Sequence, residues 1–120
     1  MKETTYQELE LDMSIRRFVT RKLIGVEQET SIKNSVAKMV EFNISSMVVM
    51  SDDEVVGFFT DSDIKARVVA AGVSADSPVK EIMTTDLVTA DVNTSVREAL
   101  NLMASQKIKH ILVTESDTIV

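Results

Sequence analysis

Two stretches of this chain follow the same pattern of residues. The first reads SIRRFVTRKLIGVEQETSIKNSVAKMVEFNISSMVVMSDDEVV at 14–56. The second aligns with it without a gap, 64 residues later, and reads PVKEIMTTDLVTADVNTSVREALNLMASQKIKHILVTESDTIV at 78–120. A Thr-Ser pair coincides at 30–31 and 94–95, and most apolar positions keep their character, such as Ile32 and Val96 or Val49 and Val113. Because positions expected in a core recur in register, the sequence predicts a tandem repeat of one supersecondary unit.

Each copy predicts the same order of elements: strand, helix, strand, strand. Apolar residues three or four positions apart indicate an amphipathic helix after each Thr-Ser start signal. The helix stripes consist of Ile32, Val36, Met39 and Val40 in the first copy and of Val96, Leu100, Met103 and Ala104 in the second. The apolar runs 23–26 and 87–90 precede the helices. The runs that start at Met47 and Ile111 follow them, and each leads through an acidic turn into a further β-branched run.

The first copy continues into a second helix. Residues 57–59 complete its third strand, and 62–71 have helical character, with Asp61 or Ser62 as the N-cap and Gly72 just past the end. We therefore expect an α/β (α+β) fold of two β-α-β-β-α repeats, in which small mixed sheets pack against helices and a pseudo-two-fold relates the repeats.

The repeat also sets the expected domain boundaries. Residues 1–13 form an N-terminal extension, 14–77 the first repeat with its linker, and 78–120 the second repeat. The second copy stops at Val120, one residue before the equivalent of Gly57, so it lacks the last strand and helix of the unit. We expect the chain to be truncated at its C-terminus or completed by exchange with another subunit, because the strand left without a neighbour would be an exposed edge.

The composition excludes several classes of function. A chain of 120 residues with 44% apolar residues can build a core, and the absence of Cys excludes disulfides and thiolate metal sites. A single His leaves no expected metal site. A net charge of −6 and 4% aromatic residues oppose binding to nucleic acid. Without a run of about 20 apolar residues or a signal peptide, we expect a soluble, cytoplasmic protein that binds no membrane.

The junction after the third strand of the first copy carries the chemistry. It reads GFFTDSD at 57–63. A carboxylate in the first helical turn can accept hydrogen bonds from two vicinal hydroxyls, while a Thr hydroxyl and early helix N–H groups face an attached phosphate or sugar oxygen. The motif suits a nucleoside. The alternative is that Thr60 ends a strand, that Asp61 and Asp63 cap a helix, and that nothing binds.

This motif, placed inside a tandem repeat, resembles the cystathionine β-synthase (CBS) domain family, whose domains occur in pairs called Bateman modules. The segments 14–20 and 78–84 resemble the lead-in to each repeat of the family, and the resemblance covers about 14–120. It implies a regulatory binding module for AMP, ADP, ATP or S-adenosylmethionine, often a homodimer, with no catalysis. In agreement, the lone His has no Ser or Asp partner at the spacing of a nucleophile–base pair.

The resemblance also implies site residues. Asp63 would hold the ribose hydroxyls, Thr60 the ribose or phosphate, and Phe58 would line the adenine slot. Ser46 occupies a position that carries a basic phosphate ligand in some members, and its lack of charge favours a nucleoside-like or weakly bound ligand over a triphosphate. The second repeat would close this pocket with Val88, Thr89, Thr94 and Ala99.

A second, weaker site would form by the pseudo-symmetry of the repeats. It would comprise Thr30, Ser35, Lys109 and His110, and the equivalent of its Gly-x-x-Thr-x-x-Asp motif would lie beyond Val120. For His110 the alternative is an exposed residue at the start of a strand. Two other functions stay open: a dimerisation or interaction module with an empty cleft, and a sensor fragment of a larger enzyme, transporter or transcription regulator.

Overall fold

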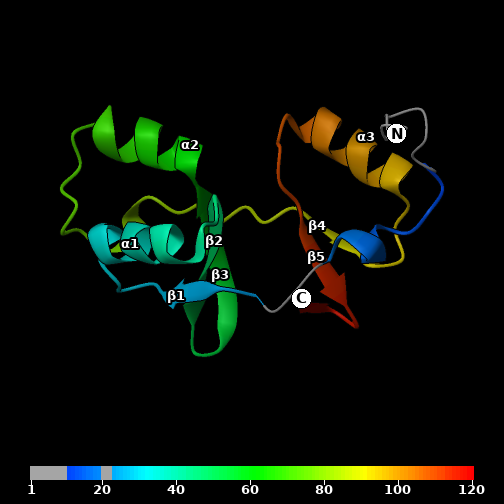
Figure 1. Ribbon diagram of the computed structural model, residues 1–120, viewed down its shortest axis with the longest axis horizontal. Helices are drawn as coiled ribbons and strands as arrows, with labels where there is room; N and C mark the ends of the chain where they lie inside the picture. Colours follow the sequence, from blue (N-terminus) through cyan, green and yellow to red (C-terminus); the bar gives the residue numbers. More distant parts are fainter. Residues whose placement is uncertain (1–10, 20–22) are drawn as a thin grey trace, which may run out of the picture. The chain divides into compact units, whose positions relative to one another are not determined.

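The computed structural model describes residues 11–19 and 23–120, and residues 1–10 of the expected N-terminal extension lie outside the described ranges. The chain forms two compact units (Figure 1). One unit comprises residues 23–87, and the other joins 88–120 to residues 11–19. Each unit contains a three-stranded mixed sheet and helices, which confirms the predicted α+β class.

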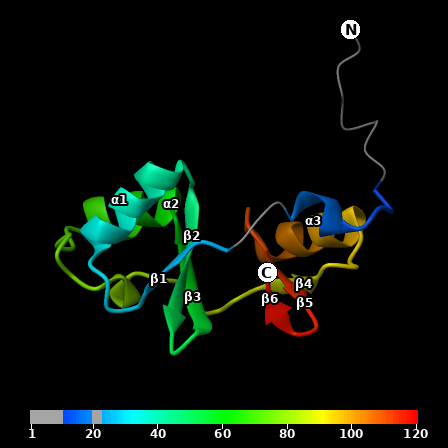
Figure 2. The ribbon, with the colours of Figure 1, turned by 60° about the horizontal axis from the view of Figure 1, so that its bottom comes forward.

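The unit 23–87 follows the predicted order of the first repeat. Its elements are β1 (Gly25–Glu27), α1 (Ile32–Phe42), β2 (Ser46–Ser51), β3 (Glu54–Thr60), α2 (Asp61–Asp63), the π-helical segment η3 (Ile64–Val69) and the short 3-10 helix η4 (Val79–Glu81). The sheet has the order β1-β2-β3, in which β1 is parallel and β3 antiparallel to β2. In Figures 1 and 2, α1 and α2 lie on the same side of this sheet, so one hydrophobic core lies between them and the strands.

The other unit repeats the same plan. Its elements are the 3-10 helix η2 (Ile15–Phe18), β4 (Thr89–Asp91), α3 (Val96–Gln106), β5 (Leu112–Glu115) and β6 (Thr118–Ile119). Its sheet has the order β4-β5-β6, again with a parallel pair followed by an antiparallel pair. The predicted order of strand, helix, strand, strand is confirmed in both copies.

The same capping devices delimit α1 and α3. The hydroxyls of Ser31 and Ser95 accept the backbone N–H groups of the residues three positions later, as N-caps do. Both helices end in a left-handed residue, Asn43 with φ 52° and Lys107 with φ 57°. The two hairpins also turn alike, because both central residues at 52–53 and at 116–117 have positive φ, as tight two-residue hairpin turns require.

The predicted helix stripes are only partly buried. Ile32 and Met39 are buried in the core, but Val40 is 75% exposed, so its predicted core position is wrong. Val40 follows Ile32 by eight residues, which places it about 80° away around the helix. Leu100 is 49% exposed, whereas its equivalent Val36 packs against a core that also receives side chains from the segment after β3.

The two segments that lead into the repeats are exchanged between the units. The N–H of Val79 donates to the carbonyl of Thr30 at 2.8 Å, within the unit 23–87. At the equivalent position of the other unit, the N–H of Ile15 donates to the carbonyl of Thr94 at 2.9 Å. The lead-in of each repeat therefore pairs with the strand-to-helix loop of the other repeat.

The exchanged segments also fill the cores. Val79 is fully buried and Ile82 is 3% exposed in the cluster of the unit 23–87. Ile15 is buried against Ala90 and Val96 of the other unit. The compact units thus differ from the repeats defined by sequence, because each core takes side chains from both copies.

Candidate functional site

The residues of the GFFTDSD motif meet where β3 passes into α2. Thr60 ends β3 and is 9% exposed. Its backbone N–H and its hydroxyl donate to Oδ2 of Asp63, at 2.9 and 3.2 Å, and the backbone N–H of Asp63 donates to the hydroxyl oxygen of Thr60 at 3.4 Å. This reciprocal pattern is a capping box. The N-cap is therefore Thr60, and the expected N-cap at Asp61 or Ser62 is wrong, because the extended backbone of Thr60 turns its hydroxyl onto the first turn.

The second carboxylate oxygen of Asp63 faces a cation that the sequence reasoning missed. Oδ1 lies 3.7 Å from Nε of Arg67, and Nη1 of Arg67 donates to the carbonyl of Ile82 at 3.1 Å. The acid–base spacing of four residues within a helical segment is the sequence signal that could have found Arg67. Since 3.7 Å exceeds the length of a hydrogen bond, Oδ1 keeps lone pairs for a further donor.

Two other predicted residues lie on the strands beside this junction. Ser46 on β2 is paired with Thr60 on β3, and Phe58 lies two residues before Thr60, so their side chains share a face of the sheet. Ser46 and Phe58 are both half-buried. The backbone N–H and carbonyl of Phe58 bond to the carbonyl and N–H of Thr84, at 3.0 and 2.8 Å. The structure thus gathers Ser46, Phe58, Thr60 and Asp63 at one end of the β2–β3 pair.

The predicted residues of the second repeat belong to the other unit. Val88 accepts the backbone N–H of Leu112 at 3.1 Å, and Thr89 is exposed on β4. Thr94 is half-buried at the start of α3, and Ala99 is 4% exposed within the hydrophobic cluster. Their role toward a ligand stays a prediction.

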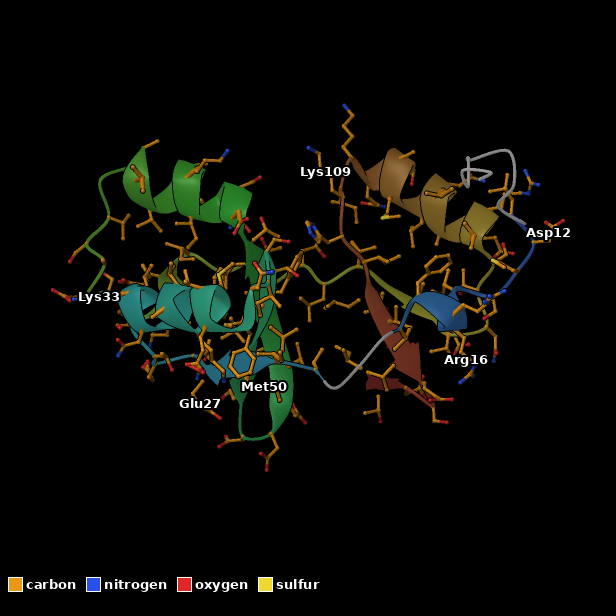
Figure 3. All side chains as sticks on the ribbon, in the orientation of Figure 1. Asp12, Arg16, Glu27, Lys33, Met50 and Lys109 are labelled. Atoms are coloured by element: carbon orange, nitrogen blue, oxygen red, sulfur yellow. The ribbon has the colours of Figure 1, made fainter. Side chains whose placement is uncertain are left out.

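The residues of the weaker second site also divide between the units. Thr30 accepts the N–H of Val79, and Ser35 is fully buried, with its hydroxyl donated to the carbonyl of Ser31 at 2.9 Å. Lys109 and His110 are exposed between α3 and β5, and Figure 3 shows the Lys109 side chain extending away from the ribbon. The hydroxyl hydrogen of Ser35 is therefore already used in a hydrogen bond to the helix backbone.

Over 11–19 and 23–120, no group of three or more His, Asp or Glu is placed to hold a metal ion. No helix in the same ranges has the length and apolar character needed to cross a membrane.

Known proteins share this sequence pattern and architecture. The sequence model of the family described as "CBS domain" matches residues 15–70 and 79–120. A crystal structure of an uncharacterized conserved protein from Pyrococcus horikoshii has a TM-score of 0.89 and 46% identity, over 93% of this chain and 86% of that one. The CBS domain-containing protein YhcV of Bacillus subtilis is 28% identical over 107 residues, which are 89% of this chain and 76% of the relative.

A more distant structure contains ligands. The CBS domain pair of protein MJ0100, solved in complex with 5′-methylthioadenosine and S-adenosyl-L-methionine, has a TM-score of 0.78 at 21% identity. The alignment covers 90% of this chain and 88% of that one. At that identity the likeness is one of fold.

Proposed function

The chain belongs to the CBS domain family, and from that premise we propose that its two repeats form a regulatory module that binds an adenosine-containing ligand: AMP, ADP, ATP or S-adenosylmethionine. The observation that carries the proposal is the Thr60–Asp63 pair, which holds a half-buried carboxylate at the end of β3. The complex of the MJ0100 pair with two adenosine derivatives supports the ligand class. Regulation rather than catalysis is proposed, because the chemistry gathered here binds hydroxyls and supplies no nucleophile–base pair.

The hydrogen bonds of Asp63 leave one oxygen suited to a ribose. Oδ2 accepts both donors of Thr60, which fixes the orientation of the carboxylate. Oδ1 has lone pairs that can accept the vicinal hydroxyls of a ribose, and charge-assisted bonds of this kind are the stronger ones. The capping role and the ligand role are therefore compatible in the same residue.

The neighbours of this carboxylate suit the rest of an adenosine. Phe58 supplies a half-buried aromatic edge on the same sheet face. Ser46, paired with Thr60, supplies a hydroxyl and no positive charge. We infer that the ligand is a nucleoside or a weakly held nucleotide rather than a tightly held triphosphate. Contributions of Val88, Thr89, Thr94 and Ala99, and a second site at Thr30, Ser35, Lys109 and His110, belong to the proposal as predictions from the resemblance.

A homodimer formed through helices is a second part of the proposal, and it also serves the alternative of an interaction module without a ligand. Val40 and Val69 are 75% and 74% exposed, and Phe42 is 48% exposed, all on helical segments of the unit 23–87. We propose that a second copy of the chain covers apolar side chains of these helical segments. A mass twice that of the chain in sedimentation equilibrium at micromolar concentration supports the dimer, and the mass of a single chain contradicts it.

The lack of Cys and of a membrane-spanning helix among the described residues favours a cytoplasmic setting.

Thermal shift measurements with AMP, ADP, ATP and S-adenosylmethionine test the ligand proposal. A ligand at a hundredfold excess over its Kd stabilises the native state by about 2.7 kcal/mol, so the melting temperature should rise clearly with at least one of the four. The rise should be much smaller in Asp63→Asn, whose amide oxygen can still accept from Thr60, and should persist in Asp61→Asn, which alters an exposed carboxylate of the same turn. No shift with any ligand, or an equal shift in Asp63→Asn, contradicts the proposal.

A further inference from the structure

The side chain of Arg67 joins two parts of the unit 23–87. Its Nε lies 3.7 Å from Oδ1 of Asp63, and its Nη1 donates to the carbonyl of Ile82 at 3.1 Å. We propose that Arg67 is a positioning residue that ties the Asp63 carboxylate to the lead-in segment 78–84, so that a ligand held by Asp63 alters how firmly that segment is held. The coupling rests on the proposed function, since it needs a ligand at Asp63.

Arg67 acts on the oxygen that a ligand would use. Oδ2 of Asp63 is occupied by both donors of Thr60, so the cation faces the remaining oxygen. The Asp63 side chain is 20% exposed and that of Arg67 is 48% exposed, so a ligand can reach the pair without unfolding it. The planar guanidinium offers several donors in a fixed fork and can meet a carboxylate and a carbonyl together, whereas a Lys ammonium concentrates its charge at one point.

Arg67 lies within a local departure from α-helical geometry. Residues 64–69 form a π-helical turn, in which the N–H of Ala70 donates to the carbonyl of Lys65, five residues earlier, at 2.9 Å. Such turns are rare and occur frequently at functional sites. The turn starts directly after Asp63 and contains Arg67, which contacts both Asp63 and Ile82.

The segment held by Arg67 contacts the proposed site at a second point. Ile82 is 3% exposed, and two residues later Thr84 exchanges two backbone hydrogen bonds with Phe58. The segment is thus bonded to the residue proposed to line the adenine and, through Arg67, to the carboxylate proposed to hold the ribose. From Thr84 the chain continues through 85–88 into β4 of the second repeat.

Hydrogen exchange of the full chain, followed by mass spectrometry, tests this coupling. Wild type is compared with Arg67→Met, which removes both contacts, with Arg67→Lys, which keeps the charge, and with Lys65→Met, which removes an exposed cation of the same turn. Without ligand, we expect peptides that cover 82–84 to exchange at least threefold faster in Arg67→Met and at the wild-type rate in Lys65→Met. Saturating AMP should change the exchange of these peptides in wild type and in Lys65→Met but not in Arg67→Met.

The outcomes separate this inference from the proposed function. Arg67→Lys should bind AMP with a Kd within about twofold of that of wild type, while its peptides that cover 82–84 exchange as fast as those of Arg67→Met. A substitution that only destabilised the fold would not combine normal binding with faster exchange in this segment. If wild type binds AMP and Arg67→Met shows the same exchange and the same response to AMP, Arg67 does not couple the site to the segment. If wild type binds none of AMP, ADP, ATP and S-adenosylmethionine, each tested separately, the proposed function and the coupling are both overturned. The comparison without ligand then decides by itself whether Arg67 holds the segment.

Discussion

The hydroxyl and the backbone N–H of Thr60 converge on one carboxylate oxygen of Asp63, at 3.2 and 2.9 Å. The same two residues form the N-terminal capping box of α2, since the N–H of Asp63 returns to the Thr60 hydroxyl. A helix cap and the carboxylate that we propose to bind a ligand are therefore combined in a Thr-x-x-Asp spacing. The cap fixes the orientation of this carboxylate, and under the proposed function such preorganisation lowers the cost of binding.

Two substitutions of Thr60 should distinguish the effect of its hydroxyl on stability from the effect of its side-chain volume. Thr60→Val keeps the β-branched volume at a buried position but removes the cap, and we expect a loss of about 1 kcal/mol in the free energy of unfolding. Thr60→Ser retains the hydroxyl and should lose less than Thr60→Val. Urea denaturation measures both, and equal stabilities of Thr60→Val and wild type would show that the capping box contributes nothing.

Substitution of Ile15 should loosen the second repeat although Ile15 lies in the first. Its side chain is buried against Ala90 and Val96, so Ile15→Ala should destabilise by about 2–4 kcal/mol. Hydrogen exchange should then increase in α3 and leave α1 near the wild-type rate. The matched variant Val79→Ala should produce the reverse pattern, because Val79 is buried in the unit 23–87. Faster exchange in α1 after Ile15→Ala would contradict the exchange of lead-in segments.

A methyl group at Gly57 should displace the lead-in segment from β3. A Cβ at this position would lie 2.5 Å from Sδ of Met83 and 2.9 Å from the carbonyl oxygen of Thr84. We expect Gly57→Ala to destabilise by about 1–3 kcal/mol, as overpacking does. The double variant with Met83→Ala should not recover stability fully, because the Thr84 carbonyl remains in place. Calorimetry of the single variant would refute the close approach if its Tm equalled that of wild type.

The left-handed residue that ends α3 offers a stabilising substitution. Lys107 has φ 57° where α1 has Asn43 with φ 52°, and Gly adopts this conformation without the penalty of a Cβ. Lys107→Gly should therefore raise the free energy of unfolding by about 1 kcal/mol. Asn43→Gly should gain less, because Asn tolerates the left-handed region. Chemical denaturation of the two variants would contradict this expectation if Lys107→Gly were less stable than wild type.

Much of the fold could be predicted from the repeat, because helix stripes, Ser caps and short apolar runs are local signals. The order of elements follows from them. The pairing of Ser46 with Thr60 does not, because it depends on a register shift between Val49 and Met50 that the apolar runs do not specify. The exchange of the lead-in segments could not be predicted, since a buried Val79 or Ile15 has the same local pattern whichever unit receives it. The exposure of Val40 also depends on how wide a helix face the small sheet covers, which a stripe of apolar residues does not specify.

The candidate site shows the same limit. The spacing of Thr60 and Asp63 was visible in the sequence, and their hydrogen bonds follow from the geometry of a helix start. Arg67 was missed, although its spacing from Asp63 is that of a helical ion pair. Its contact with Ile82 joins residues 15 positions apart, and such a contact has no local sequence signal.

Isothermal titration with AMP and with 2′-deoxy-AMP tests most directly whether Asp63 recognises a ribose. A hydrogen bond to a charged group contributes about 1.5–3 kcal/mol, and about 1.4 kcal/mol is a factor of ten in Kd. Wild type should therefore bind AMP at least about tenfold more tightly than 2′-deoxy-AMP, and Asp63→Asn should lose most of this difference. Equal affinity of wild type for the two nucleotides, or unchanged discrimination in Asp63→Asn, would contradict the assignment of the ribose to Asp63.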